Sequence, residues 1–142
     1  MRDVLFTPKI LVCPSDTVLP QRRIARDWGT GANGFINSQY RDAAVSYFIS
    51  LDAPPLVPQA AICGDRNVNY YGRRSACSAG PPNAWFISSF PSPVWTNSLH
   101  GVTGNLLLND GGVLQTSSSG LSNATVPNWM GDNGLNHTLS PQ

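Results

Sequence analysis

A tight reversal of the chain at residues 109–112 constrains the fold more than any other feature of the sequence. A run of three leucines at 106–108 precedes an Asn-Asp-Gly-Gly segment, and a second short segment, 113–115, begins the return. Asn and Asp tolerate a left-handed backbone, and glycine adopts it without steric cost, so this sequence favours a tight turn between antiparallel strands. We therefore predict a β-hairpin over residues 105–116.

The composition indicates a β-rich chain with many loops. Of the 142 residues, 13 are glycine and 12 are proline, no glutamate occurs, and Lys9 is the only lysine. Good helix formers are therefore scarce, which favours short strands joined by turn-rich loops. We expect an α+β to mainly β fold: a small antiparallel sheet with long loops rich in Gly, Pro, Asn and Ser.

Charge and hydropathy exclude two classes of partner. The formal net charge is +1, and the arginines neither cluster nor outnumber the acidic residues, so we expect no nucleic-acid partner. The longest apolar run, 10–13, is far shorter than the roughly 20 residues that cross a bilayer. Taken by itself, the chain is expected to be soluble.

Four further segments are predicted as strands: 9–13, 45–51, 59–63 and 84–90. The second is the clearest, because Val45, Tyr47, Ile49 and Leu51 form one continuous apolar face. The residues between them are Ser46, Phe48 and Ser50. The third should pair antiparallel with it across a proline-containing loop. We expect irregular structure at 18–42 and 69–82, and after residue 117 a loop-like tail with at most a helical turn near Leu121.

Four motifs follow one another in a set order. They are a Cys-Pro-Ser-Asp segment at 13–16, a segment at 46–53 that contains most of the second predicted strand, a Gly-Asp-Arg-Asn segment at 64–67, and a histidine separated by nine residues from an Asp-Gly pair. Their order and spacing resemble a bacterial family of prepilin-like proteins, often described as type II secretion system proteins or pseudopilins. The resemblance covers roughly residues 5–120. Its motif residues are Cys13, Pro14, Asp16, Gly64, Asp65, Arg66, Asn67, His100, Asp110 and Gly111.

The resemblance implies a structural protein. It implies a pilin-like globular head at 1–120, followed by a loop-rich tail at 121–142 that docks on the head or trails from it. The expected function is that of a subunit of a type IV pilus-like or type II secretion pseudopilus fibre, with other pilin or pseudopilin subunits as partners. The expected location is the cell envelope, on its periplasmic or extracellular side.

Family members open with a basic leader, a Phe-Thr-Leu-Ile-Glu junction and a long apolar helix that anchors the precursor in the inner membrane. None of these is present in this chain. We therefore expect that the chain is the head without its N-terminal helix, and that Met1 lies downstream of the true start.

The cysteines and the Asp-Arg pair have structural interpretations. Cys63 and Cys77 flank a polar loop and would pair if the domain is exported, although small buried thiols at strand ends are an equal alternative. Neighbours on a strand point to opposite faces, so Asp65 and Arg66 should find separate partners. We expect loop amides for Asp65, and for Arg66 a carboxylate such as Asp16 or Asp52.

Metal binding and catalysis are the competing hypotheses. Asp16, Asp65, Asp110 and Asp132 are calcium candidates because loop carboxylates suit that ion, and related pseudopilins often bind calcium in the head; no Asp-x-Asp-x-Asp cluster occurs, and we expect no cofactor. We also expect no enzyme, with His100 bonding a loop carbonyl and Asp110 serving the turn. A histidine within hydrogen-bond reach of Asp110, Asp65 or Asp16, in a concave pocket, would favour catalysis.

A secreted carbohydrate- or ligand-binding module is the second class of function that stays open. Aromatic faces stack on sugars, although tryptophan is more often part of a core. This alternative requires that the four tryptophans line one exposed groove. They are Trp28, Trp85, Trp95 and Trp129.

Overall fold

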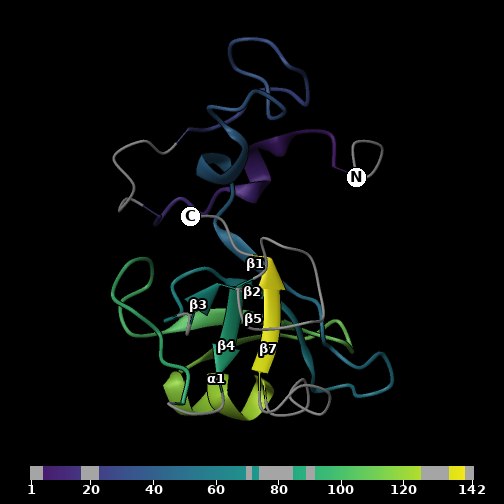
Figure 1. Cartoon of the computed structure of the whole chain (residues 1–142), viewed down its shortest axis with the longest axis vertical. Helices are drawn as coiled ribbons and strands as arrows, with labels where there is room; N and C mark the ends of the chain where they lie inside the picture. The colour runs from purple at the N-terminus through teal and green to yellow at the C-terminus, as the bar shows by residue number, and fades with distance from the viewer. Residues whose placement is uncertain are drawn as a thin grey trace.

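One antiparallel sheet organises the molecule (Figure 1). The computed structural model describes residues 5–16, 23–69, 72–73, 85–88, 92–125 and 135–139. Within them the strand order is β3-β4-β7-β1-β2-β5-β6, and each pairing is antiparallel. The fold is therefore α+β to mainly β, as predicted. The strands are β1 (Tyr47–Ser50), β2 (Ala61–Asp65), β3 (Gly72–Arg73), β4 (Trp85–Ser88), β5 (Gly104–Leu108), β6 (Val113–Thr116) and β7 (Leu135–Leu139).

The predicted hairpin is confirmed as β5 and β6. Gly111 N donates to Leu108 O at 3.0 Å, and Leu108 N donates to Gly112 O at 2.9 Å. Gly111 has a φ of +85°, and Asp110 Oδ1 accepts a hydrogen bond from Gly112 N at 2.8 Å. This is a four-residue turn closed by a left-handed glycine, a connection that matches the twist of the two strands.

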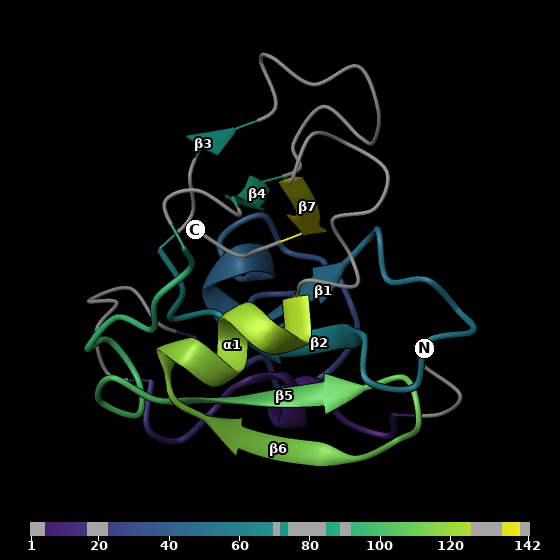
Figure 2. The ribbon, with the colours of Figure 1, turned by 90° about the horizontal axis from the view of Figure 1, so that it is seen from below.

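The main core lies between the sheet and the helix α1 (Ser118–Thr125). Figure 2 shows α1 across the part of the sheet formed by β1, β2 and β5. Phe48, Gly64 and Leu106 are register partners on three adjacent strands, and all three are buried. A Cβ on Gly64 would lie 2.7 Å from both Phe48 Cε1 and Leu106 Cδ2, so the glycine lets these two side chains meet. We call the sheet and α1 the sheet body.

The predicted strand at 45–51 is confirmed as β1. The alternation suggests that its apolar face is the buried one, but the structure buries the opposite face. Ser46, Phe48 and Ser50 are buried. The apolar face is the more open one, with Ile49 47% and Leu51 39% exposed. The reason is that α1 covers the face that carries Phe48, whose ring is the largest fully buried side chain.

Three other strand predictions have mixed outcomes. Segment 84–90 contains β4, whereas segment 59–63 overlaps β2, which begins at Ala61 and continues to Asp65. The segment 9–13 is not a strand: Pro8–Leu11 forms a 3-10 helix, η1. Thr7 accepts a hydrogen bond from Lys9 N and Pro8 sits in the first turn, where a fixed φ favours helical backbone.

The C-terminal segment departs from the expected loop-rich tail. Residues 121–125 complete α1, and β7 lies between β4 and β1 inside the sheet. This strand gave no sequence signal because Leu135–Leu139 contains three polar residues out of five. Two segments were predicted to be irregular. The described part of 18–42 consists mainly of turns and bends and includes the start of a 3-10 helix, η2 (Arg41–Ala44). In the predicted 69–82 loop, residues 72–73 form β3.

Residues 5–16 and 23–46 form a second region, which we call the N-terminal lobe. Figure 1 shows it at the opposite end of the long axis from α1. It contains η1 and η2 and has a small core of its own. That core consists of Val12, Ala25, Tyr40 and Ala44, with Phe35 packed against it.

Candidate functional site

Six of the ten motif residues meet where the N-terminal lobe touches the sheet body: Cys13, Asp16, Asp65, Arg66, Asn67 and His100. Arg66, directly after β2, forms a bidentate salt bridge with Asp16 of the lobe. Its Nε donates to Oδ2 at 2.7 Å, and its Nη2 donates to Oδ1 at 2.5 Å. Ser46 Oγ donates to the same Oδ2 at 2.7 Å. The side chains of Asp16 and Arg66 are only 1% and 11% exposed. This is the Arg66–carboxylate pair that the sequence predicted, with Asp16 as the partner.

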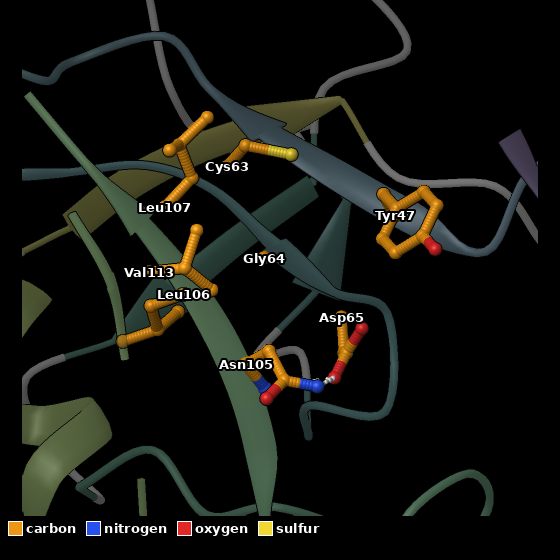
Figure 3. Close-up of a pocket in the computed structure, with 8 residues that line it drawn as sticks. All are labelled: Tyr47, Cys63, Gly64, Asp65, Asn105, Leu106, Leu107 and Val113. Atoms are coloured by element: carbon orange, nitrogen blue, oxygen red, sulfur yellow. Dashed lines mark hydrogen bonds between the residues drawn. The ribbon is translucent and has the colours of Figure 1, made fainter. Parts of the chain in front are cut away.

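Asp65 uses its carboxylate on the other face of the same strand. Its Oδ2 accepts hydrogen bonds from Asn105 N at 2.7 Å and from Asn105 Nδ2 at 2.9 Å (Figure 3). The residue is 1% exposed. A buried carboxylate needs such donors, because an unpaired charge away from water is costly. The predicted separation of Asp65 and Arg66 is confirmed, but the amides that Asp65 binds belong to strand β5 and not to a loop.

His100 joins this cluster instead of bonding a loop carbonyl through its ring. Its Nε2 lies 3.4 Å from Asp65 Oδ2 and 3.4 Å from Cys13 Sγ. Cys13 is buried, and the His100 side chain is 22% exposed. The histidine therefore links the Cys-Pro-Ser-Asp segment of the lobe to β2 of the sheet body.

Asn67 completes the set by holding the loop that carries the histidine. Its Nδ2 donates to Thr96 O at 3.0 Å and to Thr103 O at 2.9 Å, and Thr96 N donates back to Asn67 O at 2.6 Å. Thr103 Oγ1 in turn donates to His100 O at 2.8 Å. Asn67 is 1% exposed, so these bonds position the loop from inside the protein.

The cysteine, histidine and aspartate together have the residue types of a catalytic triad but a different geometry. In a triad one ring nitrogen faces the nucleophile and the other faces the orienting carboxylate. Here His100 Nε2 is the nitrogen nearest to both Cys13 and Asp65. The distance from His100 to Asp65 is short enough to favour catalysis. However, His100 does not line the hollow beside Asp65. The arrangement is better suited to fixing the loop than to passing a proton.

That hollow opens on the sheet face away from α1 (Figure 3). Its volume is about 230 Å³, and its surface is largely apolar. Burial raises the pKa of the Cys63 thiol above its usual value of 9.0, a backbone hydrogen bond at Gly64 opposes this, and the negative charge of Asp65 adds to it. The lining residues are Tyr47, Cys63, Gly64, Asp65, Asn105, Leu106, Leu107 and Val113.

The remaining candidate residues do not join the cluster. Asp110 is exposed at the hairpin turn, and Pro14 lies in the turn that Asp16 N closes on Cys13 O at 3.0 Å. Across the described residues, no three His, Cys, Asp or Glu side chains are placed to hold a metal ion. Cys77 and Asp132 lie outside the described residues, so the Cys63–Cys77 disulfide and the fourth calcium candidate stay predictions.

The two tryptophans with described side chains, Trp28 and Trp95, lie in different regions and do not line one exposed groove. Trp95 is 3% exposed in the main core, and its Nε1 donates to Thr116 Oγ1 at 3.1 Å. Trp28 belongs to the N-terminal lobe, where it packs edge-on against Phe35 at 5.3 Å between ring centroids. The side chains of Trp85 and Trp129 lie outside the described part of the chain.

Sequence reasoning missed two members of the cluster, Ser46 and Asn105. Both lie inside the quoted motifs, one at the start of the 46–53 strand and one between His100 and Asp110. Their roles depend on strand pairing between distant segments, and spacing along the chain carries no such information.

Comparisons with known proteins return no family model, no curated protein and no solved structure that matches this chain. None of the helices in the described ranges is both long enough and apolar enough to span a membrane.

Proposed function

We propose that this chain is the globular head of a structural subunit in a type IV pilus-like or type II secretion pseudopilus fibre. The observation that carries the proposal is that the charged motif residues bind partners inside the protein. Asp16, Asp65 and Arg66 direct their charged groups into the protein, where they bind one another or Asn105. A subunit that transmits force along a fibre requires residues that hold its regions together.

The resemblance indicates the class of fibre, and the internal contacts explain how the head would withstand force within it. A head that transmits force must keep its loops fixed to its sheet, and buried bidentate pairs give geometric specificity as well as energy. The Arg66–Asp16 pair joins segments fifty residues apart, and the His100–Cys13 contact joins segments 87 residues apart. Both contacts cross from the sheet body to the N-terminal lobe.

The two alternatives have less support. Catalysis at Cys13 and His100 would need a second ring nitrogen facing a carboxylate and an open approach to a sulfur that is buried. A carbohydrate-binding module would need exposed aromatic faces, whereas Trp95 is enclosed in the core.

The proposal is tested in cells of the source organism with antibodies raised against this chain. We expect the antigen in the fibre fraction sheared from the cell surface, in a polypeptide larger than 15.3 kDa because an assembly helix would add to the head. Genomic sequence upstream of the Met1 codon should encode that helix in frame. Antigen found only in the unsheared soluble fraction, at the mass of the head alone, would contradict the proposal.

A further inference from the structure

Strand β6 forms one border of the sheet. It pairs with β5 alone among the described strands, and Figure 2 shows it at the rim with β5 on its inner side. Such an edge presents a row of N–H and C=O groups that can pair with another strand.

The hairpin register fixes which groups of β6 point outward. Leu108 bonds Gly112 across the turn, and Leu114 lies opposite Leu106 two positions further on. Bonded and non-bonded pairs alternate along an antiparallel ladder, so the backbone groups of Leu114 face β5. Those of Val113 and Gln115 therefore face away from the sheet.

This edge lacks the charged residues and prolines that often protect an edge strand from pairing. Edge strands of stable monomers commonly carry lysine, proline or an inward-pointing charge. β6 reads Val-Leu-Gln-Thr, with no charged residue and no proline. Val113 is 72% exposed and Leu114 is 48% exposed, so apolar side chains accompany the outward backbone groups.

We propose that β6 is a docking edge for β6 of a second copy of this chain, antiparallel and with the two-fold axis at Leu114. In this register Val113 faces Gln115 of the second copy, and Gln115 faces Val113 of the second copy. Each such pair exchanges both N–H···O bonds, so the outward groups of both residues are satisfied. The two Leu114 side chains then lie opposite each other at the closest pair position and cover each other's exposed surface.

Self-complementarity argues for a second copy as the occupant. Any extended peptide could accept the backbone bonds, but a two-fold interface buries the same apolar residue from both sides. The formal net charge of +1 leaves little repulsion between copies. The contact is small, and we therefore expect a weak, concentration-dependent dimer. The inference goes beyond the proposed function, because edge pairing needs only the head.

Sedimentation velocity in reducing buffer, at protein concentrations up to about 1 mM, tests the dimer. We expect the average mass to rise from 15.3 kDa toward twice that value. Leu114→Lys should stay monomeric over the series, since two ammonium groups would face each other, and its circular dichroism should match the parent chain. Ile36→Lys is the matched control, because Ile36 is 52% exposed and lies in the N-terminal lobe, and this variant should dimerise like the parent.

A mixing experiment tests the register itself. Equal amounts of Leu114→Lys and Leu114→Asp should form a dimer at concentrations where each alone is monomeric, because opposite charges then meet across the axis. A parent chain that stays monomeric throughout, a dimer that survives Leu114→Lys, or a mixture no more associated than its components would each overturn the proposal.

Discussion

The sheet body and the N-terminal lobe reach stability by different routes. The body buries large side chains, among them Phe48, Trp95 and Leu106, between its sheet and α1. The hydrophobic core of the lobe consists of four buried residues, of which two are alanines. Its links to the body are polar: the Arg66–Asp16 pair, the bond from Arg66 N to Ser46 O at 3.0 Å, and the contact of His100 Nε2 with Cys13 Sγ at 3.4 Å.

The small core of the lobe explains why polar motif residues lie at its junction with the sheet body. Apolar burial stabilises in proportion to area, so the lobe's small core contributes little by itself. A bidentate pair that is nearly enclosed adds both energy and a fixed geometry at the junction. The lobe is thus held by its contacts with the body more than by its own interior.

The largest expected effect is a break in the body core. Phe48→Ala removes a fully buried ring and should lower the free energy of unfolding by about 3–5 kcal/mol. Urea denaturation followed by far-UV circular dichroism measures this loss. Phe6→Ala is the matched control: its ring is 96% exposed, and the variant should unfold at the parent's midpoint. Equal losses for the two variants would show that the body core is not the main source of stability.

The second prediction breaks the junction. Asp16→Ala leaves the guanidinium of Arg66 nearly buried without its partner, which should cost about 3 kcal/mol. Native-state hydrogen exchange should show the greater loss of protection in the lobe, for example at Phe35 N, which bonds Asp27 O. Loss confined to the sheet strands would contradict the polar attachment of the lobe.

A double variant separates the charge from the shape of this pair. Asp16→Leu combined with Arg66→Met removes both charges and keeps apolar volume at the junction, and such replacements of buried pairs are often neutral or stabilising. We expect the double variant to recover most of the stability lost by Asp16→Ala. A double variant as unstable as Asp16→Ala would mean that the hydrogen-bond geometry matters more than the buried charge.

The third prediction compares one glycine from each region. Gly64→Ala forces a methyl group to within 2.7 Å of Phe48 and Leu106, and overpacking of this kind costs about 1–3 kcal/mol. Gly31→Ala in the lobe meets no atom within 4 Å and should leave stability within about 0.5 kcal/mol of the parent. Thermal unfolding of both variants gives the comparison. A larger loss for the Gly31 variant would reverse the assignment of the tightly packed region.

The hairpin and the antiparallel pairing of β1 with β2 could be predicted because each has a local signal, in turn residues or in alternation. The Arg66–Asp16 pair was one of two expected pairings, because neighbours on a strand point to opposite faces and Arg66 therefore needs a carboxylate other than Asp65. The exposed face of β1 could not, since the position of α1 decides which side is buried. η1 was mistaken for a strand because apolar β-formers at 9–13 outweighed Pro8. The contact of His100 with Cys13 depends on 87 intervening residues, and no spacing rule encodes it.

The smallest expected effect separates the two cysteines of the two regions. Cys13 lies at the junction, whereas Cys63 lies on the open face of the sheet, where burial raises its pKa above 9.0. The folded protein thus keeps this thiol protonated at a pH where the unfolded chain ionises. Its contribution to stability is full below pH 9.0 and is lost as pH rises through the folded pKa.

Alkylation by iodoacetamide across pH 7–11, read at the Cys63 peptide by mass spectrometry, measures that pKa. We expect the folded protein to have a midpoint above 9.0 and the urea-unfolded chain to have a midpoint near 9.0. Asp65→Asn should move the folded midpoint downward, because the carboxylate's negative charge no longer opposes the thiolate. Identical midpoints for the folded and unfolded chains would mean that the sheet face around Cys63 is as open to water as an unfolded chain. Burial of the thiol would then not distinguish the sheet face from an unfolded chain, in contrast to the closed junction at Cys13.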